Sequence, residues 1–173
     1  MSIYYYPQEL AAFIKMENYT VLEEFKFIAE VWSRRDEFLD PKDWKSLASF
    51  RHAVTIEQIL QRSSLEEVLD VMDLMDETEN HYTADDYFVD YNQIESVLKI
   101  LKMQLLFSLK KGYKTIKVRT LLFFLHKKRR SPSMVKELER IFNELGITLS
   151  LKGEKPCSLG TVALDDYIVL RLK

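Results

Sequence analysis

A run of four basic residues, Lys127, Lys128, Arg129 and Arg130, directly precedes the dipeptide Ser131-Pro132. Serine followed by proline is typical of a helix start, so the run is predicted to lie in the turn before a helix. Contacts to phosphate oxygens need only positive charge in a fixed position. The run therefore predicts nonspecific binding of nucleic acid or docking on an acidic protein surface. The third interpretation is an ordinary solvated turn without a ligand.

The helix that begins near Pro132 would be the second helix of a helix-turn-helix, whose first turns face base edges when such a motif reads DNA. The residues in position to do so are Ser133, Lys136, Glu137 and Arg140. Lys136 and Arg140 stand beside Glu137, Glu139 and Glu144, which gives this face a net charge of −1. Sequence-specific reading is therefore not expected, and phosphate contacts are assigned to the basic turn together with Lys114, Lys117 and Arg119.

An acidic counterpart precedes these residues in the chain. Glu66, Asp70, Asp73 and Glu77 are spaced four, three and four residues apart, so on a helix they share one face. Stacked like charges repel, and a basic partner would relieve that repulsion. We interpret this row as an acidic docking face for the basic turn or for another protein, with a plain solvated face as the alternative.

Metal and catalytic chemistry have little support in the sequence. Glu77, His81, Asp85 and Asp86 offer oxygen and imidazole ligands, but the repeated Glu-x-x-His of bundle-type dimetal sites does not occur. The chain has no glycine-rich phosphate loop, no paired zinc ligands and no nucleophile elbow, and no histidine is tied by spacing to the single cysteine, Cys157. We expect no metal, no cofactor and a non-enzymatic protein.

Net charge divides the chain into two halves. Residues 1–95 carry 8 Lys and Arg against 21 Asp and Glu, a net charge of −13, whereas residues 96–173 carry 17 against 6, a net charge of +11. Such asymmetry favours polyanionic or oppositely charged partners. It is also compatible with one half binding the other, within a chain or head-to-tail between two copies.

Composition sets the class of protein. An apolar content of 47% with 12% aromatic residues excludes a disordered chain, and four Gly and four Pro argue against a turn-rich β architecture. The lone cysteine and the absence of a secretory signal in MSIYYYPQEL predict a reducing cytoplasm. The longest uncharged apolar runs fall well short of the roughly 20 residues of a membrane helix, so no membrane span is expected.

The first half is predicted to be a series of short helices that begin at capping signals. Thr20 with Glu23, Asp40-Pro41 and Thr55 with Gln58 are such signals. Behind the first of them an apolar stripe recurs at helical spacing, made of Val21, Leu22, Phe25, Ile28, Ala29 and Trp32.

The second half changes rhythm. A long helix from Ile94 ends at Gly112, a short alternating strand follows at 114–118, and two helices flank the basic turn. ITLSL (147–151) and DDYIVLRLK (165–173) are strands separated by a loop. The predicted order of elements is helix, strand, helix, turn, helix, strand, loop and strand. This is the order of a winged helix, which is a helix-turn-helix with a β-hairpin wing.

The segments VRTLL, KRRS, VKELERIFNELGIT and LDDYIVL carry a resemblance beyond this order. Their residue types resemble those of small winged-helix modules in bacterial restriction and phage-defence proteins. The resemblance covers the second half alone and implies an accessory component of a bacterial antiviral defence or restriction complex.

Together these observations predict a mainly α protein with two domains. Residues 1–92 form an acidic helical domain and residues 93–173 a basic winged-helix domain. The predicted function is a binding subunit whose basic turn contacts nucleic acid or an acidic protein surface. The alternative is a protein inhibitor or adaptor that works through the acidic face.

Overall fold

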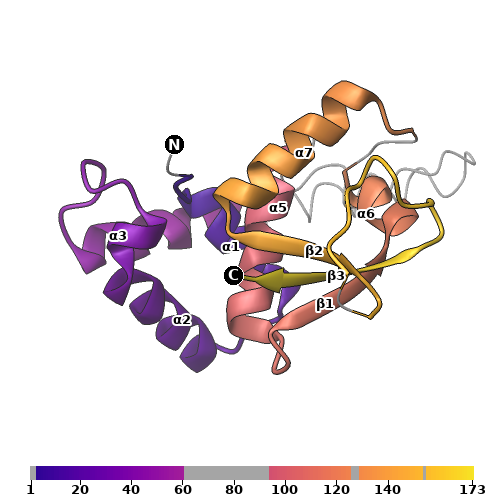
Figure 1. The fold of residues 1–173 in the computed structure, drawn as a ribbon. Coiled ribbons are helices and arrows are strands. Elements are labelled where there is room, and N and C mark those ends of the chain that lie inside the picture. The colour runs from indigo at the N-terminus through magenta and orange to yellow at the C-terminus, as the bar shows by residue number, and fades with distance from the viewer. Residues whose placement is uncertain (1–2, 61–93, 126–128, 154) are drawn as a thin grey trace, which may run out of the picture. The chain divides into compact units, whose positions relative to one another are not determined.

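The computed structural model describes residues 3–60, 94–125, 129–153 and 155–173. The chain divides into two compact units. Residues 4–90 form the N-terminal unit, and residues 91–173 with residues 1–3 form the C-terminal unit. The predicted domain boundary after residue 92 lies outside the described residues. Helix predominates in the described part of both units, as predicted, and the described strands belong to the C-terminal unit (Figure 1).

The N-terminal unit opens with two capped helices, α1 (Pro7–Met16) and α2 (Val21–Ser33). The capping box predicted for α2 is confirmed. The Glu23 N–H donates to Thr20 Oγ1 at 3.3 Å, and the Thr20 N–H donates to Glu23 Oε2 at 2.8 Å. This backbone hydrogen bond from Thr20 lowers the pKa of Glu23, because it favours the ionised carboxylate. A short helix, α3 (Arg35–Phe38), follows.

The apolar stripe predicted on α2 is wrong in its first members. Val21 and Leu22 are 80% and 62% exposed, whereas Phe27, Ile28 and Val31 are buried. Apolar residues recur at helical spacing on two neighbouring faces of this helix, so periodicity alone admits either. Packing of Phe27 on Phe13, with ring centroids 5.0 Å apart, selects the second face.

The helix start predicted at Asp40-Pro41 is also wrong. Asp40 Oδ1 accepts the Lys42 N–H at 2.9 Å, and residues 41–43 form a turn. Aspartate closes such a local turn as readily as it caps a helix, and here the turn wins. Trp44 therefore lies outside a helix, with its ring centroid 5.4 Å from that of buried Phe50.

Residues 47–60 are helical, and the start of this segment replaces the one predicted at Thr55. The Ser49 N–H donates to Ser46 Oγ at 3.2 Å, which is an N-cap contact. Thr55 lies inside the helix, where its hydroxyl donates to the Arg51 carbonyl oxygen at 3.0 Å. A threonine can satisfy its hydroxyl in this way at interior positions, so its presence alone does not fix a helix start.

The C-terminal unit follows the predicted order of elements (Figure 1). Helix α5 (Ile94–Met103) continues as a π-helical turn, η2 (Gln104–Ser108). The remaining elements are β1 (Tyr113–Lys117), α6 (Val118–Phe124), α7 (Pro132–Glu144), β2 (Ile147–Leu151) and β3 (Tyr167–Leu172). Two consecutive helices, α6 and α7, are thus followed by two antiparallel strands.

The three strands form one antiparallel sheet with β3 in the centre, in the order β1-β3-β2 (Figure 1). Ile116 of β1 pairs with Ile168 of β3, and Leu149 of β2 pairs with Leu170 of β3. These side chains belong to one face of the sheet, and that face packs on the core formed with α5, α6 and α7. Ile3 packs against the same core.

Among the described residues, no helix is both long enough and apolar enough to cross a membrane.

Candidate nucleic-acid interface

The start of α7 is built as its sequence predicts. Pro132 occupies the first turn, and the Met134 N–H donates to Ser131 Oγ at 3.2 Å. Ser133 is exposed, and its Oγ lies 3.0 Å from Ser131 Oγ. The exposed first turn of a helix of this length has N–H groups and a dipole that favour an anion, so this end of α7 is suited to a phosphate group.

The basic turn divides into residues with different roles. Lys127 and Lys128 lie outside the described residues. Arg129 is exposed, whereas Arg130 is half-buried and its Nη1 donates to two carbonyl oxygens, those of Leu159 and Val162, the latter at 2.5 Å. Arg130 therefore fastens the segment that precedes β3 to the start of α7.

Glu139 holds the same segment from the middle of α7. Its Oε1 accepts the Ser158 hydroxyl at 2.6 Å and the Leu159 N–H at 3.1 Å. The sequence analysis predicted that Glu139 is one of the outward-facing charges of α7. That prediction is wrong, because the carboxylate of Glu139 is engaged by Ser158 and Leu159. Without it, the outward face carries Lys136 and Arg140 against Glu137 and Glu144, and the predicted net charge of −1 becomes zero.

Arg140 is engaged within its own helix. Its Nε and Nη2 donate to the two carboxylate oxygens of Glu137 at 3.0 and 2.7 Å, and its Nη1 donates to Glu144 Oε1 at 2.6 Å. The side-chain hydrogen bond from Arg140 lowers the pKa of Glu137. A guanidinium held by two carboxylates is not positioned to read a base edge, whereas Lys136, one turn earlier, is exposed.

The three basic residues near β1 also have partners. Arg119 makes a two-pronged ion pair with Asp165, at 2.9 Å from Nε to Oδ1 and 3.1 Å from Nη2 to Oδ2. Lys114 Nζ donates to Gln104 Oε1 at 2.7 Å, and Lys117 Nζ lies 5.2 Å from the ring centroid of Tyr167.

The predicted binding residues therefore do not form one patch. Ser133, Lys136 and Arg140 share the outward side of α7 by their spacing, with Arg129 just before it. Lys117 points from the opposite face of the sheet, because its neighbour Ile116 points into the core beneath α7. The acidic face formed by Glu66, Asp70, Asp73 and Glu77 lies outside the described residues, as do His81, Asp85 and Asp86.

Strand alternation places on the sheet a group of four residues, of which the sequence had indicated Lys117 alone as a binding residue. Tyr113, Lys117, Tyr167 and Arg171 all point away from the core, and the register pairs Tyr113 with Arg171 and Lys117 with Tyr167. The signal was present in GYKTIK and DDYIVLRLK, where a tyrosine and a basic residue stand four positions apart and so share one face of a strand.

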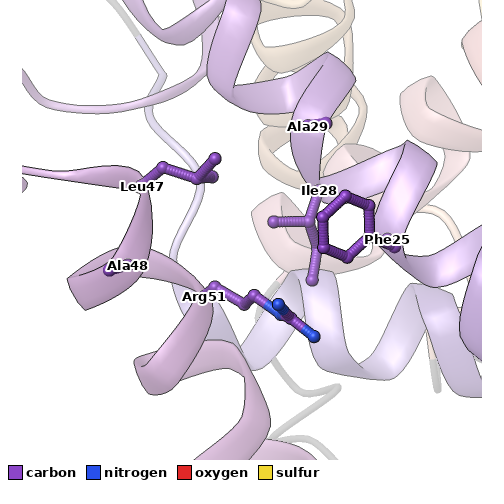
Figure 2. A pocket seen from close by; sticks show the side chains of 6 residues that line it. All are labelled: Phe25, Ile28, Ala29, Leu47, Ala48 and Arg51. Carbon is purple, nitrogen blue, oxygen red and sulfur yellow. The ribbon is translucent and has the colours of Figure 1, made fainter.

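The N-terminal unit contains a pocket of about 320 Å³, and Figure 2 shows its lining. Phe25, Ile28, Ala29, Leu47 and Ala48 form apolar walls, and the Arg51 guanidinium lies 4.8 Å from the Phe25 ring centroid. None of these six described residues carries a carboxylate, imidazole, hydroxyl or thiol. They offer an apolar surface with one cation and no acid–base or nucleophilic group.

The metal and nucleophilic sites considered from the sequence are not formed by residues in the described part of the chain. No cluster of three or more His, Cys, Asp or Glu that could hold a metal ion occurs there. Partial burial, with a smaller effect of Glu139, raises the pKa of the Cys157 thiol. A raised pKa reduces the thiolate fraction at neutral pH and with it the reactivity of the sulfur.

The Arg140 ion pairs give a testable prediction about pH. In the folded protein the Glu137 carboxyl is expected to titrate below its ordinary pKa, and Arg140→Gln should return that pKa toward the ordinary value. Because the folded-state pKa is lowered, the ion pair stabilises the fold at pH above the unfolded-state pKa, and the contribution disappears as pH falls through the lowered value.

The measurement is an NMR titration of side-chain carboxyl carbons. Asp165 is the internal control, because Arg119 lowers its pKa and Arg140 does not contact it. Titration of Glu137 at the same pH in the wild type and in Arg140→Gln would contradict the ion pair.

Comparisons with known proteins add no assignment to this geometry. No protein-family model matches the chain, and searches of curated proteins and of solved structures found no match.

Proposed function

We propose that the C-terminal unit is a winged-helix module that binds duplex nucleic acid through its phosphate backbone, without reading sequence. The observation that supports the proposal is the order of two consecutive helices, α6 and α7, and the antiparallel strands β2 and β3, together with the exposed, serine-capped N-terminus of α7. The segment between β2 and β3 takes the place of the wing.

Charge supports the proposal. Residues 96–173 carry a net charge of +11. Arg129 and Lys136 are exposed near the start of α7, where the helix dipole also favours an anion. In the proposed complex these two residues and the Ser133 hydroxyl contact phosphate oxygens.

The ion pairs of Arg140 are the reason that we propose binding without recognition of base sequence. Discrimination between bases needs donors and acceptors aimed at base edges, and an arginine that donates two hydrogen bonds to guanine is the commonest contact of this kind. Arg140 is already paired with Glu137 and Glu144. The module therefore acts as a general contact to the nucleic-acid backbone and serves as a non-enzymatic accessory subunit. A bacterial antiviral defence or restriction complex is the proposed setting, and the sequence resemblance alone supports it.

The test is a fluorescence-anisotropy titration of a labelled duplex with the full chain across a salt series. Affinity should fall steeply with salt and be the same for duplexes of unrelated sequence. Reversing both charges in R129E/K136E should reduce the slope of log K against log salt by about 2, because each phosphate contact contributes about 0.9.

The control variant is K42E/K45E, which changes two exposed lysines of the N-terminal unit and alters the net charge equally. It should retain the wild-type slope. Equal losses in the two variants would show that net charge and not the α7 surface governs binding, and no duplex binding at low salt would overturn the proposed function.

A further inference from the structure

The sheet of the C-terminal unit has a second face, opposite the core. By strand alternation this outer sheet face consists of Tyr113, Thr115, Lys117, Thr148, Ser150, Tyr167, Val169 and Arg171. Most of these side chains are exposed or half-buried, and Tyr167 is 51% exposed. The face is distinct from the α7 surface, because α7 packs on the other side of the sheet.

Two cation–aromatic pairs lie on this face. Lys117 Nζ is 5.2 Å from the Tyr167 ring centroid, and Arg171 Cζ is 5.3 Å from the Tyr113 ring centroid. Both pairs join directly opposite residues of β1 and β3. Because Tyr113 and Lys117 are four residues apart, the pairs are about 13 Å apart at about 3.3 Å per residue.

The charge of the face has one sign. None of its eight residues is acidic. The carboxylate near Lys117 is Asp165, which pairs with Arg119. Lys110 and Lys111 are exposed in the turn that leads into β1 at the Tyr113 end, and Lys173 is exposed just beyond Arg171. Positive charge therefore extends past the sheet at this end.

This combination points to a particular ligand chemistry. Unpaired bases stack on aromatic rings and on guanidinium planes, while cations between the stacking positions hold the phosphates. An acidic peptide would use the cations but would gain little from two tyrosine rings. A duplex would keep its bases inside and present only phosphates. The Thr115 hydroxyl lies between the two pairs on β1, and the Ser150 hydroxyl lies beside them on β2, where both can donate or accept. The Thr148 hydroxyl donates to the Arg171 carbonyl oxygen at 3.2 Å.

We propose that the outer sheet face binds single-stranded nucleic acid, with unpaired bases stacked at the Tyr113–Arg171 and Lys117–Tyr167 pairs. The strand crosses β1 and β3, and its phosphates lie near Lys117 and Lys111. This site does not depend on the duplex contacts proposed for α7, so each proposal can fail without the other.

The first experiment titrates the full chain with labelled oligo-dT and oligo-U. Y113L/Y167L should weaken single-strand binding at least about tenfold, because it removes both rings, and should leave duplex binding within about twofold. Y113F/Y167F is the matched control and should bind single strands as the wild type does, since phenylalanine retains the ring. R129E/K136E should lower duplex binding and spare single-strand binding.

The outcomes of these titrations distinguish a single-strand binding site from a surface that recognises negative charge alone. Binding of either oligonucleotide with this pattern supports the site, and the stronger of the two identifies DNA or RNA as the source of the strand. Wild-type affinity in Y113L/Y167L overturns the proposal. Equal weakening of oligo-dT and of polyglutamate by Y113L/Y167L also overturns it, because the face would then recognise negative charge alone.

A second measurement uses wild-type protein and therefore tests the site even if Y113L/Y167L fails to fold. Wild-type protein is irradiated with an oligonucleotide that contains iodouracil, and the adducts are located by mass spectrometry. Adducts on the peptides that contain Tyr113 or Tyr167 support the site, and their absence from both overturns it.

Discussion

Replacing Phe142 with alanine is expected to lower the free energy of unfolding of the C-terminal unit by about 3 to 5 kcal/mol. Phe142 lies on α7 and is 1% exposed within the core that α5, α6, α7 and the sheet share. Its removal leaves a cavity beneath the helix that carries the proposed duplex contacts. Urea unfolding followed through the amide NMR signals of β3 measures the change in this unit.

Phe123→Ala is the matched control for this prediction. Phe123 belongs to the neighbouring helix α6 but is 74% exposed, so its replacement should change the free energy of unfolding by no more than about 0.5 kcal/mol. Similar losses in the two variants would contradict the assignment of Phe142 to the core and Phe123 to the surface.

Arg130→Met is expected to destabilise the C-terminal unit by about 2 to 3 kcal/mol, through a mechanism other than loss of charge. The methionine retains apolar volume but removes the donors to the carbonyl oxygens of Leu159 and Val162. Hydrogen bonds from a charged donor contribute about 1.5 to 3 kcal/mol, and the carbonyls left behind are partly shielded from water. Hydrogen exchange at the Thr161 and Val162 amides, together with urea unfolding, provides the measurement.

Arg129→Met is the matched variant that distinguishes the role of Arg129 from that of Arg130. Arg129 is exposed, so its replacement should leave stability and amide exchange unchanged and should weaken duplex binding modestly. The expected pattern is a structural defect at position 130 and a binding defect at position 129. A loss of stability at position 129 equal to that at 130 would show that the basic turn acts as a unit.

Elements of the C-terminal unit could be predicted from sequence because local signals agreed with one another. The Ser131-Pro132 start and the alternation in 147–151 and 167–172 each admitted one structure. In the N-terminal unit the signals competed. Asp40 satisfied either a cap or a turn, and α2 offered two adjacent apolar faces, so tertiary packing made the choice.

The candidate site was less accessible to prediction than the fold. Arg129 and Arg130 are identical in residue type and adjacent, and only the carbonyls of a segment some 30 residues away distinguish them. Glu139 was assigned outward for the same reason, since its partner Ser158 is distant in sequence. The tyrosine and cation pairs required the register of β1 against β3, which no local pattern specifies.

The central position of β3 has a consequence for the order of events during synthesis. A ribosome releases β1 and β2 before β3, yet β3 is the strand that joins both of them in the described sheet, and β2 has besides it an isolated bridge between Ser150 and Pro156. Until residues 167–172 emerge, two nascent strands therefore present open hydrogen-bonding edges, which are sites of self-association and chaperone binding. The N-terminal unit is synthesised earlier, whereas the sheet closes in a single late step when β3 enters between its two neighbours.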